Sequence, residues 1–438
     1  MARYHLVTLG CSKNEVDSEK LVGQLGADGF AATDDPDQAD LLVVNTCAFI
    51  GEARQESIDT ILALAEHKGD GAKLVVTGCM AERYGDELTE AMPEIDLVAG
   101  FGHALDGDGH DHHHAPAAPG AAGSATAVSI GRKPSLPDFD LLNLPRPRST
   151  RPWAYVKVAE GCDRACGFCA IPSFRGPQRS RPIDVILDEV DALDAKEIVL
   201  VAQDLAAYGR DAGRGERSIA PLVQAVSERV DWVRLLYLYP SELTDELIEL
   251  MCAGPVPYFD LSLQHVSSPL VRRMRRWGNG ERYLERIEQI RSLRPDAAFR
   301  SNFIVGYPGE TEADHDELLG FVEEADLDWC GFFAYSREDG THAASLDGAV
   351  DPALVDERLA ELRELADPIS AARRDELIGT VTTVLVDEAG LARSHREAPE
   401  IDGVIWVPDH LEPGSMQQVR ITGAEGPDLH AELVADPG

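Results

Sequence analysis

Three cysteines in the middle of the chain have a spacing that suits iron-sulfur chemistry. Cys162, Cys166 and Cys169 form a C-x3-C-x2-C pattern directly after an apolar, strand-like run. Three thiolates on one short loop can hold three irons of a four-iron cluster and leave the fourth iron open to a substrate's amine and carboxylate. A zinc site normally needs a fourth ligand and shows C-x2-C pairs. The pattern therefore favours an open 4Fe-4S cluster over zinc and over incidental buried thiols.

Three more cysteines, far apart in the sequence, share a different feature. Cys11, Cys47 and Cys79 each follow an apolar run, in the segments Thr-Leu-Gly-Cys, Val-Asn-Thr-Cys and Val-Thr-Gly-Cys. In a parallel sheet the three strand ends lie on one edge, so the thiols are expected to converge there and hold a second cluster. The alternative is that they are small hydrophobic residues that end buried strands.

The remaining cysteines and a histidine-rich stretch receive no role. Cys252 and Cys330 have no cysteine nearby in the sequence and are interpreted as inert core thiols. Four histidines lie in a segment rich in Gly, Ala and Pro, where a solvated loop is a better interpretation than a metal site. They are His110, His112, His113 and His114.

Hydrophobic periodicity predicts the elements that position the cysteines. In the first hundred residues strand-like runs alternate with helical patterns, which predicts a parallel α/β sheet. Its expected strands are 5–10, 41–45 and 73–78, with helices near 15–25 and 53–67. Residues 106–126 show no period and are interpreted as a flexible insertion between two domains.

A second series of strands starts near Trp153. The six strand candidates are 154–158, 197–202, 232–239, 258–263, 299–305 and 329–335. With helices between most of them, six βα units are expected to curl into a partial barrel, and the C-x3-C-x2-C loop lies at the carboxyl end of its first strand. A helix at 352–377 should follow, and then a small antiparallel barrel with strands near 380–386, 403–407 and 418–422.

The fold class is thus α/β multidomain. The expected boundaries are 1–105 for the first domain, 106–147 for the linker with the insertion, 148–377 for the partial barrel and 378–438 for the small β-barrel.

On these motifs the sequence resembles the methylthiotransferases of the radical S-adenosylmethionine superfamily. The resemblance covers nearly the whole chain and includes Asn14, the Ile171-Pro172 and Arg175-Gly176 pairs, and Ser180-Arg181-Pro182. It implies an N-terminal methylthiotransferase domain with an auxiliary 4Fe-4S cluster, a radical core with a second 4Fe-4S cluster and S-adenosylmethionine, and a C-terminal TRAM barrel. The implied cofactor contacts are Phe168, Gln203, Asp204, Gln264, Gly306 and Glu310.

Two branches of that family remain open, one that modifies an adenosine of transfer RNA and one that modifies an aspartate of small-subunit ribosomal protein number twelve. The chain has 40 Lys and Arg against 77 Asp and Glu, a formal net charge of −37. Residues 378–438 contain only Arg393, Arg396 and Arg420 against eleven acidic residues. Such a surface repels RNA and favours a basic protein partner.

Local motifs point to the same branch, with two exceptions. The segments 12–14, 48–50 and 171–176 resemble the ribosomal-protein branch. Ser262 departs from it, because that branch usually has proline there. The basic run Arg272, Arg273, Arg275 and Arg276 could touch RNA, although such a run is more often a solvated helix face.

The expected partners are therefore the ribosomal protein and an electron donor, with nucleic acid disfavoured as the substrate. No stretch reaches the ~18 apolar residues of a membrane span, and the chain begins directly with a strand-like run, so a cytoplasmic protein is expected. The hypothesis from another class is an iron-sulfur scaffold or redox-sensing adaptor, which product formation would exclude. It is disfavoured because an open-iron triplet has no structural advantage over a closed four-ligand site.

Overall fold

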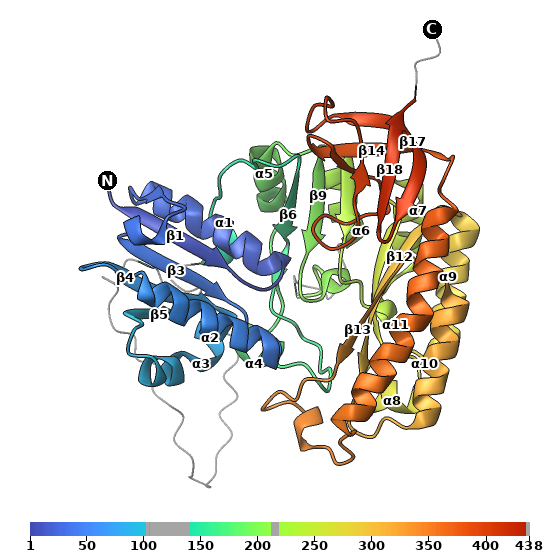
Figure 1. Ribbon diagram of the computed structural model, residues 1–438, viewed down its shortest axis with the longest axis horizontal. Coiled ribbons are helices and arrows are strands. Elements are labelled where there is room, and N and C mark those ends of the chain that lie inside the picture. Colours follow the sequence, from blue (N-terminus) through green and yellow to red (C-terminus); the bar gives the residue numbers. More distant parts are fainter. Residues whose placement is uncertain (102–104, 106–139, 212–218, 435–438) are drawn as a thin grey trace. The chain divides into compact units, whose positions relative to one another are not determined.

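The computed structural model describes residues 1–101, 105, 140–211 and 219–434 (Figure 1). The histidine-rich stretch and most of the expected linker lie outside the described residues. The chain divides into a first unit of residues 1–10, 17–48 and 53–145, and a second unit of residues 11–16, 49–52 and 146–438. No helix of the described part is long and apolar enough to cross a membrane.

The first unit contains a five-stranded sheet in the order β2-β1-β3-β4-β5, and every pair is parallel. The three predicted strands are present, and the short edge strands β2 and β5 add to them. All six residues of β3 are buried, which explains its continuous apolar sequence. The strands are β1 (Arg3–Thr8), β2 (Ala31–Ala32), β3 (Leu41–Thr46), β4 (Lys73–Gly78) and β5 (Leu97–Ala99), and the helices are α1 (Ser12–Ala27), α2 (Gly51–Glu66) and α3 (Cys79–Ala91).

The second unit contains the six predicted parallel strands. They form two three-stranded sheets, β6-β9-β10 and β11-β12-β13, which a parallel bridge between Leu238 and Leu261 joins into an open barrel. The strands are β6 (Trp153–Lys157), β9 (Glu197–Val201), β10 (Trp232–Leu235), β11 (Tyr258–Gln264), β12 (Ala298–Val305) and β13 (Trp329–Ala334). A separate two-stranded antiparallel sheet consists of β7 (Ala159–Glu160) and β8 (Arg179–Ser180).

One strand ends earlier than its apolar sequence predicts. The run 232–239 continues to Tyr239, whereas β10 stops at Leu235. Tyr237 has a φ of 64°, outside the extended region, and its N–H donates to Asp260 Oδ2 at 2.9 Å. The Tyr237 N–H therefore bonds to the side chain of Asp260 and not to a backbone carbonyl of a neighbouring strand.

Alternating residues of the barrel strands face two different cores. The side chains that pack against the outer helices include Ala154, Val156, Ile198 and Leu200. Those that line the barrel interior include Tyr155, Val199 and Val201. The helices are α4 (Ile171–Arg175), α5 (Ile183–Leu193), α6 (Ile219–Ser227), α7 (Asp245–Ala253), α8 (Ser268–Arg273), α9 (Gly280–Leu293), α10 (Glu312–Ala325) and α11 (Pro352–Asp375). Short 3₁₀ helices lie at Pro36–Gln38, Leu141–Asn143, Leu205–Ala207, Pro240–Glu242 and Ala343–Ser345.

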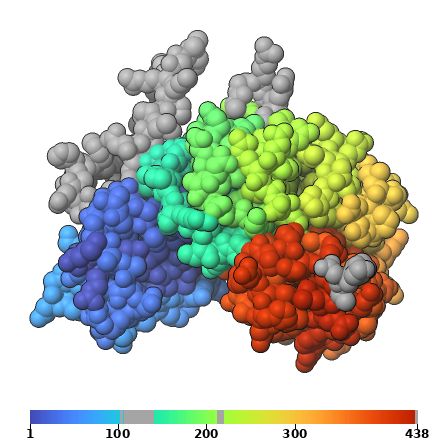
Figure 2. Space-filling view, turned by 90° about the horizontal axis from the view of Figure 1, so that it is seen from above, coloured from blue at the N-terminus to red at the C-terminus, as the bar shows by residue number. Residues whose placement is uncertain are grey.

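The last residues form the predicted small barrel, which is red in Figure 2. Its closed order is β14-β15-β16-β18-β17, and all pairs are antiparallel except β16 with β18. Its interior is filled by aliphatic side chains such as Val384, Ile405 and Val419. The strands are β14 (Val381–Glu388), β15 (Leu391–Arg393), β16 (Ile405–Trp406), β17 (Met416–Glu425) and β18 (Asp428–Leu433).

Several charges of this small barrel are not on its surface, contrary to the prediction. Arg393 is buried and pairs with Glu197 of β9 at 2.8 Å, and Glu397 is buried against Arg374 of α11 at 2.6 Å. Asp402 accepts a hydrogen bond from the Tyr258 hydroxyl at 2.6 Å, and Arg396 pairs with Asp328. The connection between β15 and β16 thus joins the small barrel to the starts of the parallel strands through buried ion pairs.

Candidate functional site

The C-x3-C-x2-C loop follows the short strand β7, just beyond the carboxyl end of β6. Cys162 is buried, Cys166 and Cys169 are half-buried, and the three thiols are close enough to interact electrostatically. Burial is the main cause that raises the pKa of Cys162 to about 11 and that of Cys169 to about 12. Both are therefore thiols near neutral pH unless a metal stabilises their thiolates.

Two glycines set the shape of this loop. Gly161 has a φ of 78°, and a Cβ there would lie 2.2 Å from the carbonyl oxygen of Pro177. Gly167 donates its N–H to Met274 O and accepts from the N–H of Ala343, both at 2.7 Å. A Cβ on Gly167 would lie 2.6 Å from the Tyr307 hydroxyl. The loop is thus fixed by backbone contacts that exclude larger residues.

Arg276 is a site residue that the sequence interpretation missed. Its Nη1 donates to Cys166 Sγ at 3.2 Å, another guanidinium nitrogen donates to Ser262 O, and the group lies 4.3 Å from the centre of the Tyr239 ring. Arg276 lies beyond the end of α8 and is half-buried. It is therefore not on a solvated helix face, although no local pattern distinguishes it from its arginine neighbours.

Gln203 and Asp204 follow the end of β9, as predicted. Gln203 Nε2 donates to Glu160 at 2.9 Å, and Asp204 pairs with Arg164 at 2.5 Å. Within the described residues, Gln203 Oε1 and Asp204 Oδ1 are buried without a hydrogen-bond partner. Burial also raises the pKa of Asp204. Buried acceptors without a partner are costly, so they suit a ligand that donates hydrogen bonds.

The other predicted cofactor contacts occupy three further loops. Phe168 packs beside Met274 and Tyr307, and its ring centre is 6.0 Å from the Arg276 guanidinium. Gln264 ends β11 with a φ of 71°. Such a conformation is uncommon for a residue other than glycine and marks a specialised position.

Gly306 and Glu310 form a single turn after β12. The Glu310 carboxylate accepts from the N–H groups of Gly306 at 2.6 Å and Tyr307 at 3.2 Å, and it pairs with Arg358 at 2.9 Å. These contacts occupy the carboxylate of Glu310. The contacts therefore give Glu310 a positioning role for the backbone of the turn.

The registers of the first sheet align the strand ends that precede the other cysteines. Thr8 pairs with Asn45, and Asn45 pairs with Thr77. Cys47 and Cys79 are buried in the first unit, where the Cys47 N–H donates to Ser57 Oγ at 3.1 Å, whereas Cys11 is exposed and belongs to the second unit.

No group of three or more His, Cys, Asp or Glu residues in the described part is arranged around a single metal ion. A four-iron cluster makes a different demand, because each of its thiolates binds a different iron. The cysteines are soft ligands, and the mutual interaction of Cys162, Cys166 and Cys169 fits such a cluster. The structure leaves Cys11, Cys47 and Cys79 as a prediction.

A second residue that the sequence interpretation missed is Glu160, directly before Gly161. Its carboxylate pairs with Arg175 at 2.8 Å and with Lys157 at 2.7 Å. Burial opposes ionisation, but these two cations outweigh it and hold the pKa of Glu160 well below its usual range. Its position next to the cysteine motif was the available signal.

The sequence matches three family models in succession. Residues 3–100 match uncharacterized protein family UPF0004, residues 156–322 match the radical SAM superfamily, and residues 378–434 match the TRAM domain. Among solved structures, the radical S-adenosylmethionine methyltransferase TsrM from Kitasatospora setae is similar, with 13% identity, a TM-score of 0.48, and coverage of 84% of this chain and 89% of that chain.

Curated relatives are similar over nearly their full length. The ribosomal protein uS12 methylthiotransferase RimO of Cutibacterium acnes is 43% identical and covers 98% of this chain and 97% of its own. The protein of the same name from Kineococcus radiotolerans is 42% identical and covers 98% and 96%. Identity at this level along the whole length makes this chain a member of the RimO family of radical S-adenosylmethionine methylthiotransferases.

Proposed function

We propose that this chain transfers a methylthio group to the β-carbon of an aspartate in ribosomal protein uS12, the small-subunit protein number twelve. The observation that carries the proposal is the loop of Cys162, Cys166 and Cys169 at the carboxyl end of a barrel strand, in a chain 43% identical to a RimO protein over 98% of its length. Catalytic loops of parallel βα barrels lie at that end of the strands. A ribosomal substrate supports a cytoplasmic location for this reaction.

The residues of the radical core divide into ligands and positioning groups. Cys162, Cys166 and Cys169 would hold a 4Fe-4S cluster, which when bound would supply the one-electron reduction that splits S-adenosylmethionine into methionine and a 5′-deoxyadenosyl radical. Gln203 Oε1 and Asp204 Oδ1, which are buried without a partner among the described residues, would accept hydrogen bonds from bound S-adenosylmethionine. Arg276 polarises the Cys166 sulfur, while Glu310 orders the turn that starts at Gly306.

The auxiliary site is proposed for Cys11, Cys47 and Cys79. The aligned ends of β1, β3 and β4 support it, because each cysteine follows one of these ends by one to three residues. This second 4Fe-4S cluster would carry the sulfur that is inserted, and another S-adenosylmethionine would supply the methyl group. Iron analysis of anaerobically prepared protein should give about eight irons per chain. About four irons, with normal deoxyadenosine formation, would remove the auxiliary site.

The surface charge of the small barrel supports a basic protein as the substrate. Exposed carboxylates are spread over its strands and turns, and Arg420 is the only exposed Lys or Arg among its described residues. This acidic barrel surface consists of Glu388, Glu400, Asp409, Glu412, Glu425 and Glu432. Such a surface attracts a basic ribosomal protein and repels a phosphate backbone.

The decisive experiment offers both branch substrates to the same preparation. The anaerobic protein with both clusters, S-adenosylmethionine and dithionite is incubated with uS12 or with transfer RNA, and each product is analysed by mass spectrometry. A methylthio group on a uS12 aspartate is the expected result. Modification of transfer RNA instead would assign the chain to the other branch, and no methylthio product with intact clusters would favour the scaffold or redox-sensor hypothesis.

A further inference from the structure

One segment of this acidic chain, residues 271–286, carries more basic than acidic side chains. Between residues 271 and 286 the sequence has six arginines and only two acidic residues, Glu281 and Glu285, in a chain of net charge −37. Arg272, Arg273, Arg275 and Arg282 are exposed, and Arg276 and Arg286 are half-buried. These six side chains, at or just beyond the end of α8 and on the first half of α9, form the arginine patch.

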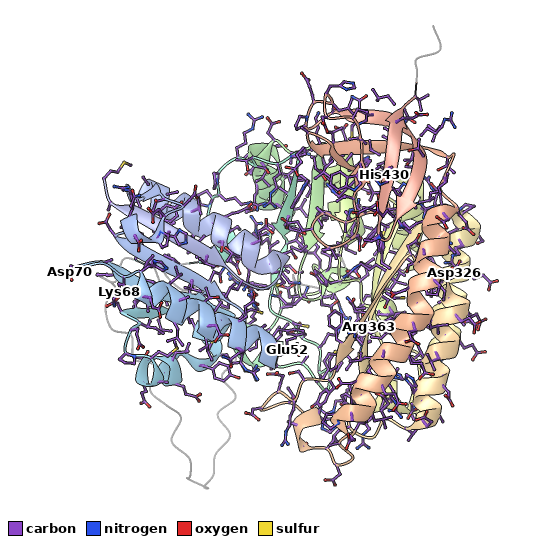
Figure 3. All side chains as sticks on the ribbon, in the orientation of Figure 1. Glu52, Lys68, Asp70, Asp326, Arg363 and His430 are labelled. Carbon is purple, nitrogen blue, oxygen red and sulfur yellow. The ribbon has the colours of Figure 1, made fainter. Side chains whose placement is uncertain are left out.

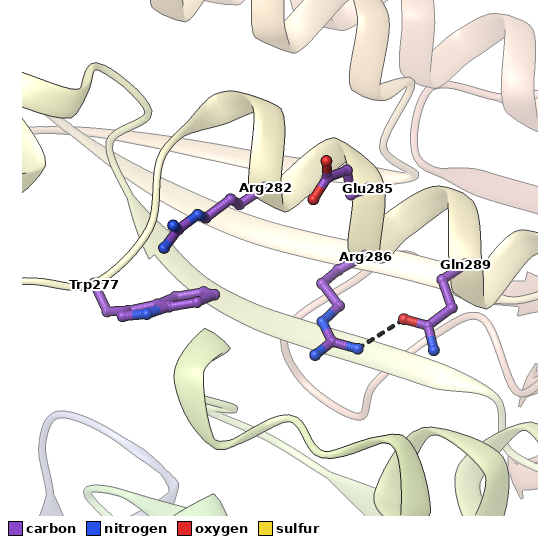
Figure 4. Close-up of a pocket in the computed structure, with 5 residues that line it drawn as sticks. All are labelled: Trp277, Arg282, Glu285, Arg286 and Gln289. Carbon is purple, nitrogen blue, oxygen red and sulfur yellow. Dashed lines mark hydrogen bonds between the residues drawn. The ribbon is translucent and has the colours of Figure 1, made fainter.

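The patch contains a pocket whose lining includes one aromatic side chain (Figure 4). The pocket has a volume of about 350 Å³ and is lined by Trp277, Arg282, Glu285, Arg286 and Gln289. Trp277 is 37% exposed, and the Arg282 guanidinium lies 5.5 Å from its ring centre. An exposed tryptophan between arginines is typical of the residues that dominate protein interfaces.

The acidic groups around the patch reduce its charge but do not cancel it. Arg286 pairs with Asp245 of α7 at 2.6 Å, and Arg273 donates to the backbone carbonyl of Asp347 at 2.8 Å. Arg275 lies against His342, with 3.0 Å between Nη2 and Nδ1. Arg272 and Arg282 are exposed to solvent and are the side chains most available to a partner.

The patch is directly connected to the cysteine loop. Trp277 follows Arg276, whose Nη1 donates to Cys166 Sγ at 3.2 Å. Met274, between Arg273 and Arg275, accepts the N–H of Gly167 at 2.7 Å. A protein docked over Trp277 is therefore separated from a candidate cluster ligand by one residue and one hydrogen bond.

We propose that the arginine patch is the docking surface of an acidic one-electron carrier protein. The inference rests on the proposed function, since it requires a cluster at Cys162, Cys166 and Cys169. The docked carrier loses one electron, and the cluster gains it. The strongly acidic chain repels such a carrier elsewhere, so the patch steers it to the cluster. RNA is less favoured, because Glu281 and Glu285 interrupt the patch and its link is to the cysteine loop.

The test measures binding of a carrier separately from chemistry. The probe is an acidic flavodoxin, and its Kd for the cluster-loaded protein is determined by calorimetry at about 20 mM and about 200 mM salt. The variant is Arg272→Glu with Arg282→Glu. The control, Arg363→Glu on α11 (Figure 3) with Arg420→Glu on β17, changes the net charge equally at exposed arginines elsewhere.

The patch variant should raise the flavodoxin Kd at low salt by at least about tenfold, and the control by less than about twofold. High salt should weaken wild-type binding and reduce the difference. Dithionite-driven deoxyadenosine formation should be equal in all three proteins. Equal Kd values in variant and control would overturn the proposal, as would an unchanged flavodoxin Kd together with lost RNA binding by the variant. Failure of wild-type protein to cleave S-adenosylmethionine with dithionite would instead overturn the proposed function, whatever the Kd values.

Discussion

Cys162 illustrates the conflict between burial and ligation at a single residue. Burial raises the pKa of its thiol to about 11, so the thiolate exists near neutral pH only when iron stabilises it. Cys162→Ala should therefore abolish dithionite-driven deoxyadenosine formation and reduce the iron content from about eight to about four per chain. Cys252→Ala in α7, a thiol outside both triplets, is the control and should leave both measurements unchanged. Deoxyadenosine formation at the wild-type rate by the Cys162 variant would disprove the ligand assignment.

Arg276 acts on the same loop through a hydrogen bond to Cys166 Sγ at 3.2 Å. Hydrogen bonds to the ligating sulfurs stabilise the more negative, reduced cluster and so raise its potential. Arg276→Met should lower the reduction potential of the cluster by about 50 mV. For a one-electron couple, about 59 mV corresponds to a tenfold change in the equilibrium constant for reduction. A redox titration followed by electron paramagnetic resonance measures this shift. A potential unchanged by the substitution would limit Arg276 to a packing role.

At the scale of elements, the connection between β15 and β16 holds a titratable group against the barrel strands. Burial raises the pKa of Asp402 from 3.8 to about 6, although Arg300 and the Tyr258 hydroxyl oppose the shift. The folded chain thus binds this proton more tightly than the unfolded chain. Its stabilising contribution is complete below about pH 4 and is lost as the pH rises through about 6.

Asp402→Asn should remove this contribution to the pH dependence. Relative to wild type, the variant's free energy of unfolding should increase by about 3 kcal/mol between pH 4 and pH 7, because one pKa unit corresponds to 1.36 kcal/mol. Urea unfolding at several pH values in this range provides the measurement. A difference between variant and wild type that is independent of pH would show that Asp402 does not titrate there.

At the scale of the whole molecule, the net charge of −37 can direct a partner to one surface only if the exposed acidic side chains are concentrated there. Reversal of Glu388, Asp409, Glu412 and Glu425 to lysine should slow uS12 association by about tenfold at low salt and leave substrate-free deoxyadenosine formation intact. The difference should diminish as salt shortens the ~8 to 10 Å screening length.

A matched set of charge reversals on α11 separates a local effect from net charge. It consists of the exposed residues Asp356, Glu357, Glu364 and Asp367. Stopped-flow association should show a smaller effect for this set than for the acidic barrel surface. Equal slowing by both sets would mean that net charge, and not the small barrel, governs the encounter.

The sequence by itself determined the order of the elements and the position of the C-x3-C-x2-C loop. Apolar periodicity predicted β3 and the six barrel strands, because their burial requires continuous apolar sequence. The early end of β10 could not be predicted from its own sequence. It depends on a hydrogen bond from Tyr237 to Asp260, a residue 23 positions further along the chain.

The tertiary structure decided which charges face water. Arg276, Glu397 and Asp402 have the same side-chain types as their exposed neighbours, and only long-range contacts with Cys166, Arg374 and Tyr258 bury them partly or fully. The amino-acid composition counts buried and exposed charged residues alike, because it does not show which residues contact each other across long sequence separations. Local sequence therefore located the chemistry, whereas packing decided which charged residues support it and which remain available to partners.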